Sequence, residues 1–540
     1  MKKALLLLAL VAVVALPFWL RPKQTGLAAA DDSLVVITPH NEAIRSEYTI
    51  GFREWYRRKT GRTVTIDWRV IGGTSEINRF LDSEYTAAFQ NFWVNKLGRA
   101  WSNDVLNAFA NPRLVLPPDA TGDSPVLAAR RAFLASDVSC GIDLFFGGGS
   151  IDFIKHAAAG RLVDSGILQL HPEWFGEGVI PQSFTGEPYW DPQGRWVGDV
   201  LSSFGIIFNR DVLRKLGIAN EPRAWADLQD PRYQGQVALS DPTKSSSIAK
   251  AFDNLVQQQM HEQWDALAAA APARDRATLE AQAVREGWER GLRMVQRIGA
   301  NARYFTDASQ KVPIDVTQGN AAAGMCIDFY GRDSANSPGL NGQPRVGYFS
   351  PVGGTVLSPD PLAVLRGAPH RAVAVAFIEY ALSMEGQLLW NYRRGSEGGP
   401  QRYELRRMPI RRDFYTEARR PLRTDPDENP YASTVQLVYQ PAWTSGIVRE
   451  MAFVIRVMCQ DTHPELVEAW KAIIAAGLPA DALAAMSDVS AVSYDEMHGR
   501  IQRALNSKNK VDEVHLAREL AEHFRQQYLR AADLARSGRR

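Results

Sequence analysis

The chain has 540 residues, 45% of them hydrophobic, 23% charged and 10% aromatic, an ordinary globular composition that excludes a wholly disordered or collagen-like chain. Its length predicts two or more domains, or one large bilobal unit. Lysine and arginine total 62 against 60 acidic residues, a formal charge of +2, so the chain lacks the cation surplus that a general nucleic-acid-binding protein needs.

The amino terminus resembles an export signal. Two lysines precede an apolar run over residues 4–16, and an alanine triplet ends at Ala30. This pattern is typical of a secretory signal peptide cleaved after Ala30, because the apolar run is shorter than the ~20 residues of a membrane-spanning helix. Two basic residues follow the run directly, so a retained membrane anchor stays open as the alternative. In either case we expect residues 31–540 to be periplasmic or otherwise extracytoplasmic.

Short strands alternate with glycine turns and helices in the first third of the chain. Residues 34–38, 64–70 and 142–146 are apolar or alternating runs that predict strands. The Gly-Gly-Thr-Ser turn at 72–75 follows the second strand, and the Gly-Gly-Gly-Ser turn at 147–150 follows the third. Each turn precedes an amphipathic helical pattern. The repeated order of strand, turn and helix predicts an α/β fold with a largely parallel sheet.

The remaining segments are mainly helical. Residues 82–137 form an aromatic-rich stretch that we interpret as a helical insertion, and residues 245–300 predict a long helical region. Residues 346–352 predict extended chain. From about residue 430 onward the apolar spacing is helical throughout, so the sequence predicts a helical C-terminal extension.

Catalytic signatures are missing from the sequence. There is no P-loop, no GxGxxG, no HExxH and no GxSxG motif. The nine histidines are scattered, and Cys140, Cys326 and Cys459 lie too far apart for a CxxC zinc site or a disulfide scaffold. We therefore expect a protein that is not an enzyme, although triads assembled across a sequence leave an exported enzyme open as an alternative.

Three loops rich in glycine and hydroxyl side chains precede helices, at residues 72–75, 147–150 and 241–247. Free backbone N–H groups and the positive end of the helix dipole make helix N-termini suitable anion sites. For any single loop, a serine or threonine that merely caps its helix is the simpler interpretation. Three similar loops favour a shared ligand cleft, which in open α/β sheets lies beyond the carboxyl ends of the strands.

The order of the segments resembles an extracellular solute-binding protein of an ABC importer, in the branch that contains the ferric-iron-binding proteins. Together the matching pieces cover about residues 33–415. They are residues 38–43 (TPHNEA), 72–76 (GGTSE), 142–146 (IDLFF), 194–198 (GRWVG), 203–209 (SFGIIFN), 225–228 (WADL), 230–235 (DPRYQG), 241–246 (DPTKSS), 324–330 (GMCIDFY) and 409–412 (PIRR).

This resemblance implies a bilobal periplasmic-binding-protein-like fold, in which two α/β lobes joined by a two-strand hinge close on a ligand. The implied crossings lie near residues 196–209 and 345–356. The implied domains are a signal peptide or anchor at 1–30, lobe 1 at 31–200 and 357–430 with the insertion at about 82–137, lobe 2 at 201–356, and the helical C-terminal extension at 431–540.

The resemblance leaves two ligand classes open. Ferric-binding relatives use a histidine after the first strand, a carboxylate after a later strand and two adjacent tyrosines. His40 and Tyr330 match by position, but Phe329 precedes Tyr330 and the carboxylate position is a glycine. A hard ferric ion prefers several anionic oxygen ligands, and only Asp328 could add one. We favour a small oxyanion, such as a phosphonate or phosphate ester, over ferric iron.

The predicted ligand-binding residues come from the loops and from the resemblance: His40, Gly73, Thr74, Ser75, Gly149, Ser150, Ser203, Thr243, Ser245, Ser246, Asp328 and Tyr330. His40 and Tyr330 would be metal ligands only if the transported ligand is ferric iron, and no other cofactor is expected. The expected partners are a small-molecule solute and the ABC permease and ATPase in the membrane, with no nucleic acid, and the chain is expected to be a monomer. A membrane-tethered ligand-sensing domain remains an alternative.

An arginine-rich segment lies between Arg393 and Arg423, where ten arginines face four acids. We interpret it as a solvated, salt-bridged surface. Contact with an acidic partner or with the membrane surface is the alternative.

Overall fold

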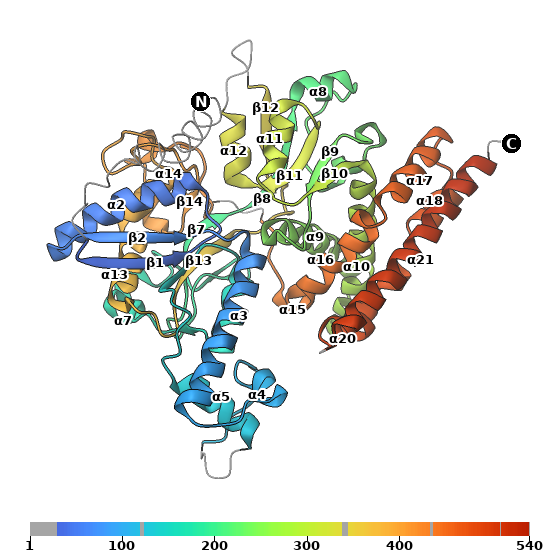
Figure 1. The fold of residues 1–540 in the computed structure, drawn as a ribbon. Coiled ribbons are helices and arrows are strands. Elements are labelled where there is room, and N and C mark those ends of the chain that lie inside the picture. Colours follow the sequence, from blue (N-terminus) through green and yellow to red (C-terminus); the bar gives the residue numbers. More distant parts are fainter. Residues whose placement is uncertain (1–29, 119–123, 337–343, 433–435, 508, 539–540) are drawn as a thin grey trace, which may run out of the picture.

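Two α/β lobes and a layer of C-terminal helices make up the molecule (Figure 1). The computed structural model describes residues 30–118, 124–336, 344–432, 436–507 and 509–538. The predicted signal peptide or anchor at residues 1–30 lies outside this range except for its last residue. In the described part of the chain no single helix is long and apolar enough to cross a membrane, although the bent pair α13 (Arg371–Leu382) and α14 (Met384–Asn391) passes that test together.

Lobe 1 is built on a seven-stranded sheet in the order β14-β7-β13-β3-β1-β2, with β4 paired to β13. Its parallel part is β1 with β2 and β3, and β13 runs antiparallel to β3 and β7. The strands are β1 (Asp32–Ile37), β2 (Val64–Arg69), β3 (Leu144–Phe146), β4 (Leu162–Val163), β7 (Val197–Ser202), β13 (Ser358–Leu365) and β14 (Met408–Pro409).

Helices cover both faces of this sheet. α2 begins at the cap residue Asn41, whose side chain accepts the backbone N–H of Ile44, and ends at Gly61 with a φ of 73°. Besides α13 and α14, the helices of lobe 1 are α2 (Glu42–Thr60), α3 (Thr74–Asn91), α4 (Asn103–Ala108), α5 (Pro125–Ala135), α6 (Ser150–Ala159) and α7 (Ile167–Leu170). A small hairpin of β5 (Ser183–Phe184) and β6 (Glu187–Pro188) completes the lobe.

Lobe 2 holds a five-stranded sheet in the order β10-β9-β11-β8-β12. The strands are β8 (Phe204–Asn209), β9 (Val237–Ser240), β10 (Ala302–Thr306), β11 (Ala323–Ile327) and β12 (Val346–Phe349). The helices are α8 (Arg210–Lys215), α9 (Ser246–Ala270), α10 (Arg276–Asn301), α11 (Lys311–Gln318) and α12 (Asp328–Ala335). The first ten residues of α9 after Ser247 are all buried, because sheet, helices and lobe 1 surround them.

The chain crosses between the lobes more than twice. β7 continues into β8 through Ser203, and β12 leads into β13 through residues 350–357. A further passage leaves lobe 1 after residue 430 and reaches the C-terminal helices. Its residues 436–440, here called the connector, lie against both lobes: the N–H of Tyr439 bonds the carbonyl of Thr185 in lobe 1, and the N–H of Gln440 bonds the side chain of Gln257 in α9 of lobe 2.

The C-terminal helices lie beside α9 and α10 of lobe 2 (Figure 1), and they share one hydrophobic core with that lobe. Trp288 of α10 donates to the carbonyl of Val492, and Gln296 of the same helix donates to the hydroxyl of Tyr528. The extension is thus continuous with lobe 2 rather than a separate body. Its helices are α15 (Pro441–Thr444), α16 (Val448–Ile455), α17 (His463–Ala475), α18 (Ala480–Met486), α19 (Tyr494–Glu496), α20 (Gln502–Leu505) and α21 (Lys510–Ser537).

The fold class predicted from the sequence, a bilobal α/β architecture with a helical C-terminal region, is confirmed. The strands predicted at 34–38 and 64–70 correspond to β1 and β2, and the strand predicted at 142–146 is shorter, at Leu144–Phe146. The three cysteines are free thiols, with Cys326 and Cys459 buried and Cys140 partly exposed.

Candidate functional site

His40 lies on lobe 1 where the two lobes meet, just before α2. Its side chain is buried, and its ring packs edge-on against Phe146, with the ring centroids 4.5 Å apart. Gly147 makes this position possible, because a Cβ on Gly147 would lie 2.4 Å from Cε1 of the imidazole. The glycine at the expected carboxylate position therefore makes room for the histidine.

Arg407 is the central residue of this site, and it is fully buried. Its Nη2 lies 2.6 Å from Oδ2 of Asp360 in β13, and its Nη1 is 3.3 Å from Nε2 of His40. The guanidinium also donates to the hydroxyl of Ser202 and stacks 4.6 Å from the ring centre of Phe329 in α12. Arg407 thus belongs to lobe 1 but packs on an aromatic ring of lobe 2.

Burial and charge fix the protonation states around Arg407. Burial lowers the pKa of His40, and the Arg407 cation lowers it further, against the opposing effect of the Asp360 hydrogen bond. Burial would raise the pKa of Asp360, but Arg407 and His40 outweigh it and hold that pKa below its usual value. His40 is therefore neutral and Asp360 ionised at neutral pH.

Tyr330 approaches the same place from lobe 2. Its ring packs against Phe329 at 4.1 Å between centroids. Burial raises the pKa of Tyr330 to about 12, although Arg407 and the side chain of Asn41 lower it. Tyr330 is therefore a neutral phenol at neutral pH, close to the N-terminus of α2. We call His40, Asp360, Arg407 and Tyr330 the arginine site.

The three predicted loops meet beside the arginine site. Thr74, at the start of α3, accepts a hydrogen bond of 3.2 Å from Ser246, at the start of α9 in lobe 2. Gly73 lies against the backbone of Lys244, since a Cβ there would be 3.1 Å from its carbonyl oxygen. Gly148, next to Gly147, packs on Thr74 in the same way. The structure therefore joins these loops and the arginine site into one interlobe surface.

Other predicted residues already have partners within the protein. Ser150 donates to Oε2 of Glu187 at 3.2 Å, and Ser203 lies 3.2 Å from the hydroxyl of Ser350. Asp328 accepts from Arg332 at 2.7 Å and from the backbone N–H of Phe329.

The remaining predicted residues lie in the loops themselves. Thr243 donates to Asp241 at 2.6 Å, and Ser245 caps α9. Gly149 is the cap residue of α6, and Ser75 is partly buried in the first turn of α3. The helix-cap interpretation therefore fits the loop at 241–247, whereas Gly73 and Gly149, the cap residues of α3 and α6, make no side-chain cap bond.

The sequence prediction missed Arg407, Asp360 and Ser202. Arg407 lies inside the arginine-rich segment that we interpreted as solvated surface, and Arg411 and Arg423 of the same segment are also buried. A usable signal was present for Asp360, which stands between Pro359 and Pro361 in an otherwise apolar strand. A carboxylate in such a strand is normally paired.

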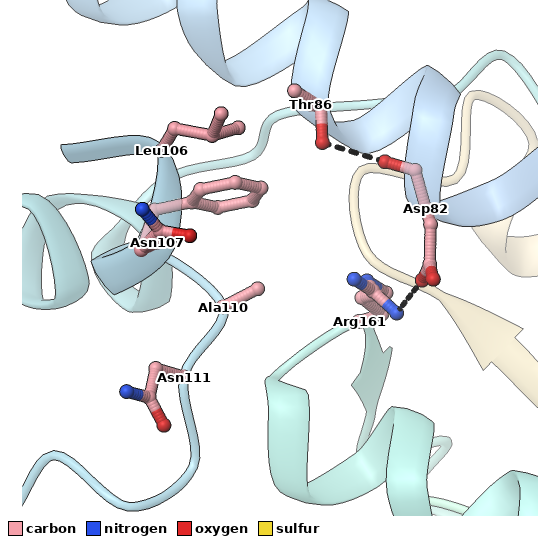
Figure 2. Close-up of a pocket in the computed structure, with 8 residues that line it drawn as sticks. Asp82, Thr86, Leu106, Asn107, Ala110, Asn111 and Arg161 are labelled. Carbon is pink, nitrogen blue, oxygen red and sulfur yellow. Dashed lines mark hydrogen bonds and ion pairs between the residues drawn. The ribbon is translucent and has the colours of Figure 1, made fainter. Parts of the chain in front are cut away.

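Two surface hollows lie elsewhere in lobe 1. One, of about 380 Å³, is bounded by α3, α4 and Arg161, whose guanidinium pairs with Asp82 (Figure 2). The other, of about 560 Å³, lies beside α6 and Trp190. None of the predicted ligand-binding residues lines either hollow. Within the described residues, no group of three or more His, Cys, Asp or Glu side chains is arranged to hold a metal ion.

Comparison with curated proteins gives distant relatives. The phosphoglycerate transport regulatory protein PgtC of Salmonella typhimurium is 27% identical over 191 residues, which are 35% of this chain and 39% of the relative. An uncharacterized protein of Haemophilus influenzae is 24% identical over 201 residues, 37% of this chain and 49% of the relative. The matched region thus spans less than half the length of each relative.

Solved structures of similar shape include two binding proteins. The periplasmic binding protein AfuA from Actinobacillus pleuropneumoniae, with fructose-6-phosphate bound, is 13% identical with a TM-score of 0.45, covering 82% of this chain and 98% of its own. The apo ferric ion-binding protein A of Pasteurella haemolytica is 12% identical with a TM-score of 0.45, covering 78% and 96%.

A family model matches the middle of the chain. Residues 141–400, just under half of the chain, match the model of the bacterial extracellular solute-binding proteins. This segment includes residues 141–200 and 357–400 of lobe 1 and all of lobe 2 at 201–356. The resemblance to the extracellular solute-binding proteins, first seen in the order of the sequence segments, is confirmed over this region.

Proposed function

We propose that this chain is the solute-binding component of an ABC importer and delivers a small solute to a membrane permease and its ATPase. The family match of residues 141–400 supports this role. Two lobes that meet at a polar surface support it too, since hinge closure buries a solute between them. We further propose a monomer that works in the periplasm or another extracytoplasmic space, and that it binds its solute without chemical turnover.

We propose a small organic oxyanion as the solute, and the buried guanidinium of Arg407 is the observation that carries this choice. Among the described residues nothing pairs with Nε of Arg407 or with Nδ1 of His40, although both atoms are buried. Arginine presents a planar fork that matches carboxylate and phosphate oxygens. The N-terminus of α2 and Arg45, which bonds the carbonyl of Asn41, add positive potential.

Charge balance narrows the class of anion. Asp360 neutralises one unit of charge at Arg407, and His40 and Tyr330 are uncharged. The site therefore has little net charge of its own and suits one anionic group on an otherwise hydroxylated molecule. A phosphate ester or phosphonate of this kind fits the neighbouring hydroxyls of Thr74 and Ser246 better than a free polyanion does.

Ferric iron is disfavoured by the same geometry. Nε2 of His40 lies 3.3 Å from Nη1 of Arg407, so a ferric ion bound to that nitrogen would lie against a fixed cation. A cation would also compete with Arg407 for Asp360. Iron binding at His40 and Tyr330 therefore requires Arg407 to move away.

A thermal-shift screen of the full chain tests the proposed solute class. The panel holds sugar phosphates, phosphonates, phosphoglycerate, inorganic phosphate, carboxylates and ferric citrate. A ligand at a hundred times its dissociation constant stabilises a protein by about 2.7 kcal/mol, which is an easily visible shift. We expect a shift with a phosphorylated or phosphonate compound that is clearly smaller in Arg407→Lys. A shift with ferric citrate alone would contradict the oxyanion proposal.

A second candidate is a ligand-sensing protein that reports solute to a regulatory partner. The relative PgtC, which is described as a transport regulatory protein, favours it. A retained N-terminal anchor would suit this role. Cell fractionation distinguishes the two: a sensor stays with the membrane at high salt, whereas a free binding protein is released with the periplasmic fraction.

A further inference from the structure

Lys250, in α9 of lobe 2, lies at the meeting point of three segments of the chain. Its Nζ is 2.6 Å from Oε1 of Glu187 in β6 of lobe 1 and 3.3 Å from Oδ2 of Asp253 on its own helix. The ring centre of Tyr439, in the connector, lies 3.3 Å from the same nitrogen. All four side chains are buried. A single ammonium group thus touches both lobes and the connector.

The side chains around Lys250 keep its ammonium group protonated. Burial would lower the pKa of Lys250, but Glu187, Tyr439 and Asp253 outweigh it and raise that pKa above its usual value. Lys250 is therefore charged at every physiological pH. A buried ion pair contributes little net stability compared with an apolar contact, but removing one partner leaves the other charge without compensation. The pair therefore favours the arrangement of lobes in which both partners meet.

The connector is fixed to both lobes beside this ion pair. Tyr439 donates its backbone N–H to the carbonyl of Thr185, in the turn between β5 and β6 of lobe 1, at 2.8 Å. On the other side, the side chain of Gln257 in α9 bonds both the N–H and the carbonyl of Gln440, at 2.9 and 3.0 Å. The passage to the C-terminal helices is therefore part of the contact between the lobes.

We propose that Glu187, Lys250 and Tyr439 form an interlobe latch, in which Lys250 is the positioning residue. The latch holds the lobes at the distance where Thr74 and Ser246 touch, and it links this closed arrangement to the C-terminal extension through Tyr439. This inference goes beyond solute binding, because it concerns how the lobes are held whatever the solute is.

A cross-linking experiment on the full chain tests the latch without any solute. The Thr74→Cys/Ser246→Cys double variant places two thiols where the hydroxyls are 3.2 Å apart. The rate of disulfide formation with a mild oxidant, followed by peptide mass mapping, reports how often the lobes meet. This rate is then compared with the rates measured after Lys250→Met, Lys250→Arg or Lys244→Met is added to the double-cysteine variant.

Lys250→Met is expected to slow cross-linking at least about tenfold, because Glu187 then loses its buried cation and favours separated, hydrated lobes. Lys250→Arg keeps the charge and is expected to restore most of the rate. Lys244→Met is the matched control, since Lys244 is an exposed lysine in the same loop that leads into α9, and we expect no change.

An unchanged cross-linking rate in a folded Lys250→Met variant would overturn the latch. Thermal unfolding is measured on each variant, so that loss of folding is separated from loss of closure. If Lys250→Met does not fold, Glu187→Gln tests the same contact from lobe 1. Failure of both variants to fold would also refute the proposal, because a latch between lobes is not needed for the fold of either lobe.

Discussion

Arg407 is a buried cation whose neighbours only partly satisfy it. Asp360 supplies the opposite charge, and Phe329 and Trp390 offer ring faces at 4.6 and 5.3 Å. Its Nε has no partner among the described residues. An unsatisfied donor of this kind is costly in a closed protein, and a bound anion would remove that cost.

Substituting Arg407 tests whether it acts on the solute or only on the fold. Arg407→Lys keeps a positive charge for Asp360 but loses the planar fork, so we expect a folded protein whose affinity for the preferred oxyanion falls at least about tenfold. Arg407→Met leaves Asp360 without a cation and is expected to cost about 3–5 kcal/mol of stability. Calorimetry and thermal unfolding separate the two effects. Equal oxyanion affinity in Arg407→Lys and the unmodified chain would remove Arg407 from the site.

Asp199, in β7, carries a buried carboxyl group whose titration makes the stability of the protein depend on pH. Gln387 donates to its Oδ1 at 2.7 Å, and Tyr48 donates to its Oδ2 at 3.3 Å. Burial raises the pKa of Asp199 to about 8, although hydrogen bonds and Arg407 oppose that change. The folded state therefore binds the proton more tightly than the unfolded state does.

The sign of the resulting pH dependence follows directly. The Asp199 contribution to stability is complete below its unfolded pKa of 3.8 and is lost as pH rises towards its folded pKa of about 8. The loss is at most about 1.4 kcal/mol per pH unit across that window. We expect Asp199→Asn, which stays neutral, to gain stability relative to the unmodified chain as pH rises from about 4 to about 8. If the difference in unfolding free energy between Asp199→Asn and the unmodified chain is the same at both pH values, the raised pKa of Asp199 is contradicted.

At the scale of elements, the turn between β5 and β6 decides where the connector runs. Thr185 and Gly186 both have positive φ, at 48° and 81°. A Cβ on Gly186 would lie 1.9 Å from the carbonyl oxygen of Tyr439. Glycine is therefore needed here both for its backbone conformation and for the close approach of the connector.

Gly186→Ala is expected to displace the connector and to destabilise the protein by about 2–4 kcal/mol, from backbone strain together with the clash. Gly217→Ala is the matched control, because its φ is 68° but nothing lies within 4 Å of an added Cβ. The difference in unfolding free energy between the two variants measures the contact with the connector. Equal destabilisation would show that only the backbone strain matters.

At the scale of the whole molecule, lobe 2 and the C-terminal helices form one unit. Trp470 of α17 donates to the side chain of Asn301 at 2.7 Å, and Tyr528 of α21 accepts from the side chain of Gln296 in α10 at 3.0 Å. The apolar faces of α9 and α10 are buried partly by these helices. The connector joins this unit to lobe 1, where the N–H of Tyr439 bonds the carbonyl of Thr185.

Removing residues 431–540 is therefore expected to unfold or aggregate lobe 2, because it exposes a continuous apolar face. Near-ultraviolet circular dichroism and analytical ultracentrifugation of the truncated chain check this outcome. A soluble, cooperatively unfolding product with a native spectrum would show instead that the extension is an independent addition.

The sequence alone determined the elements and the architecture. Apolar runs such as residues 34–38 and glycine turns at 72–75 and 147–150 are local signals, so the strands and the loops before helices could be predicted. The bilobal class was predicted from the family resemblance, which rests on the order of the motifs along the chain. The three loops were also found, because glycine and hydroxyl residues precede helices there, and His40 was found through the family resemblance. The ligand role of these residues stays a prediction.

Only the tertiary structure decided which charges face each other. Arg407 is 367 positions from His40 along the chain, and Glu187 reaches Lys250 from the other lobe. Nothing local distinguishes Arg407 from exposed arginines of the same segment such as Arg402, because the pairing of a charge depends on the dielectric and the partners around it rather than on adjacent residues. The same reason explains why the arginine-rich segment resembled solvated surface, while the folded chain buries several of its cations between elements that are distant in sequence.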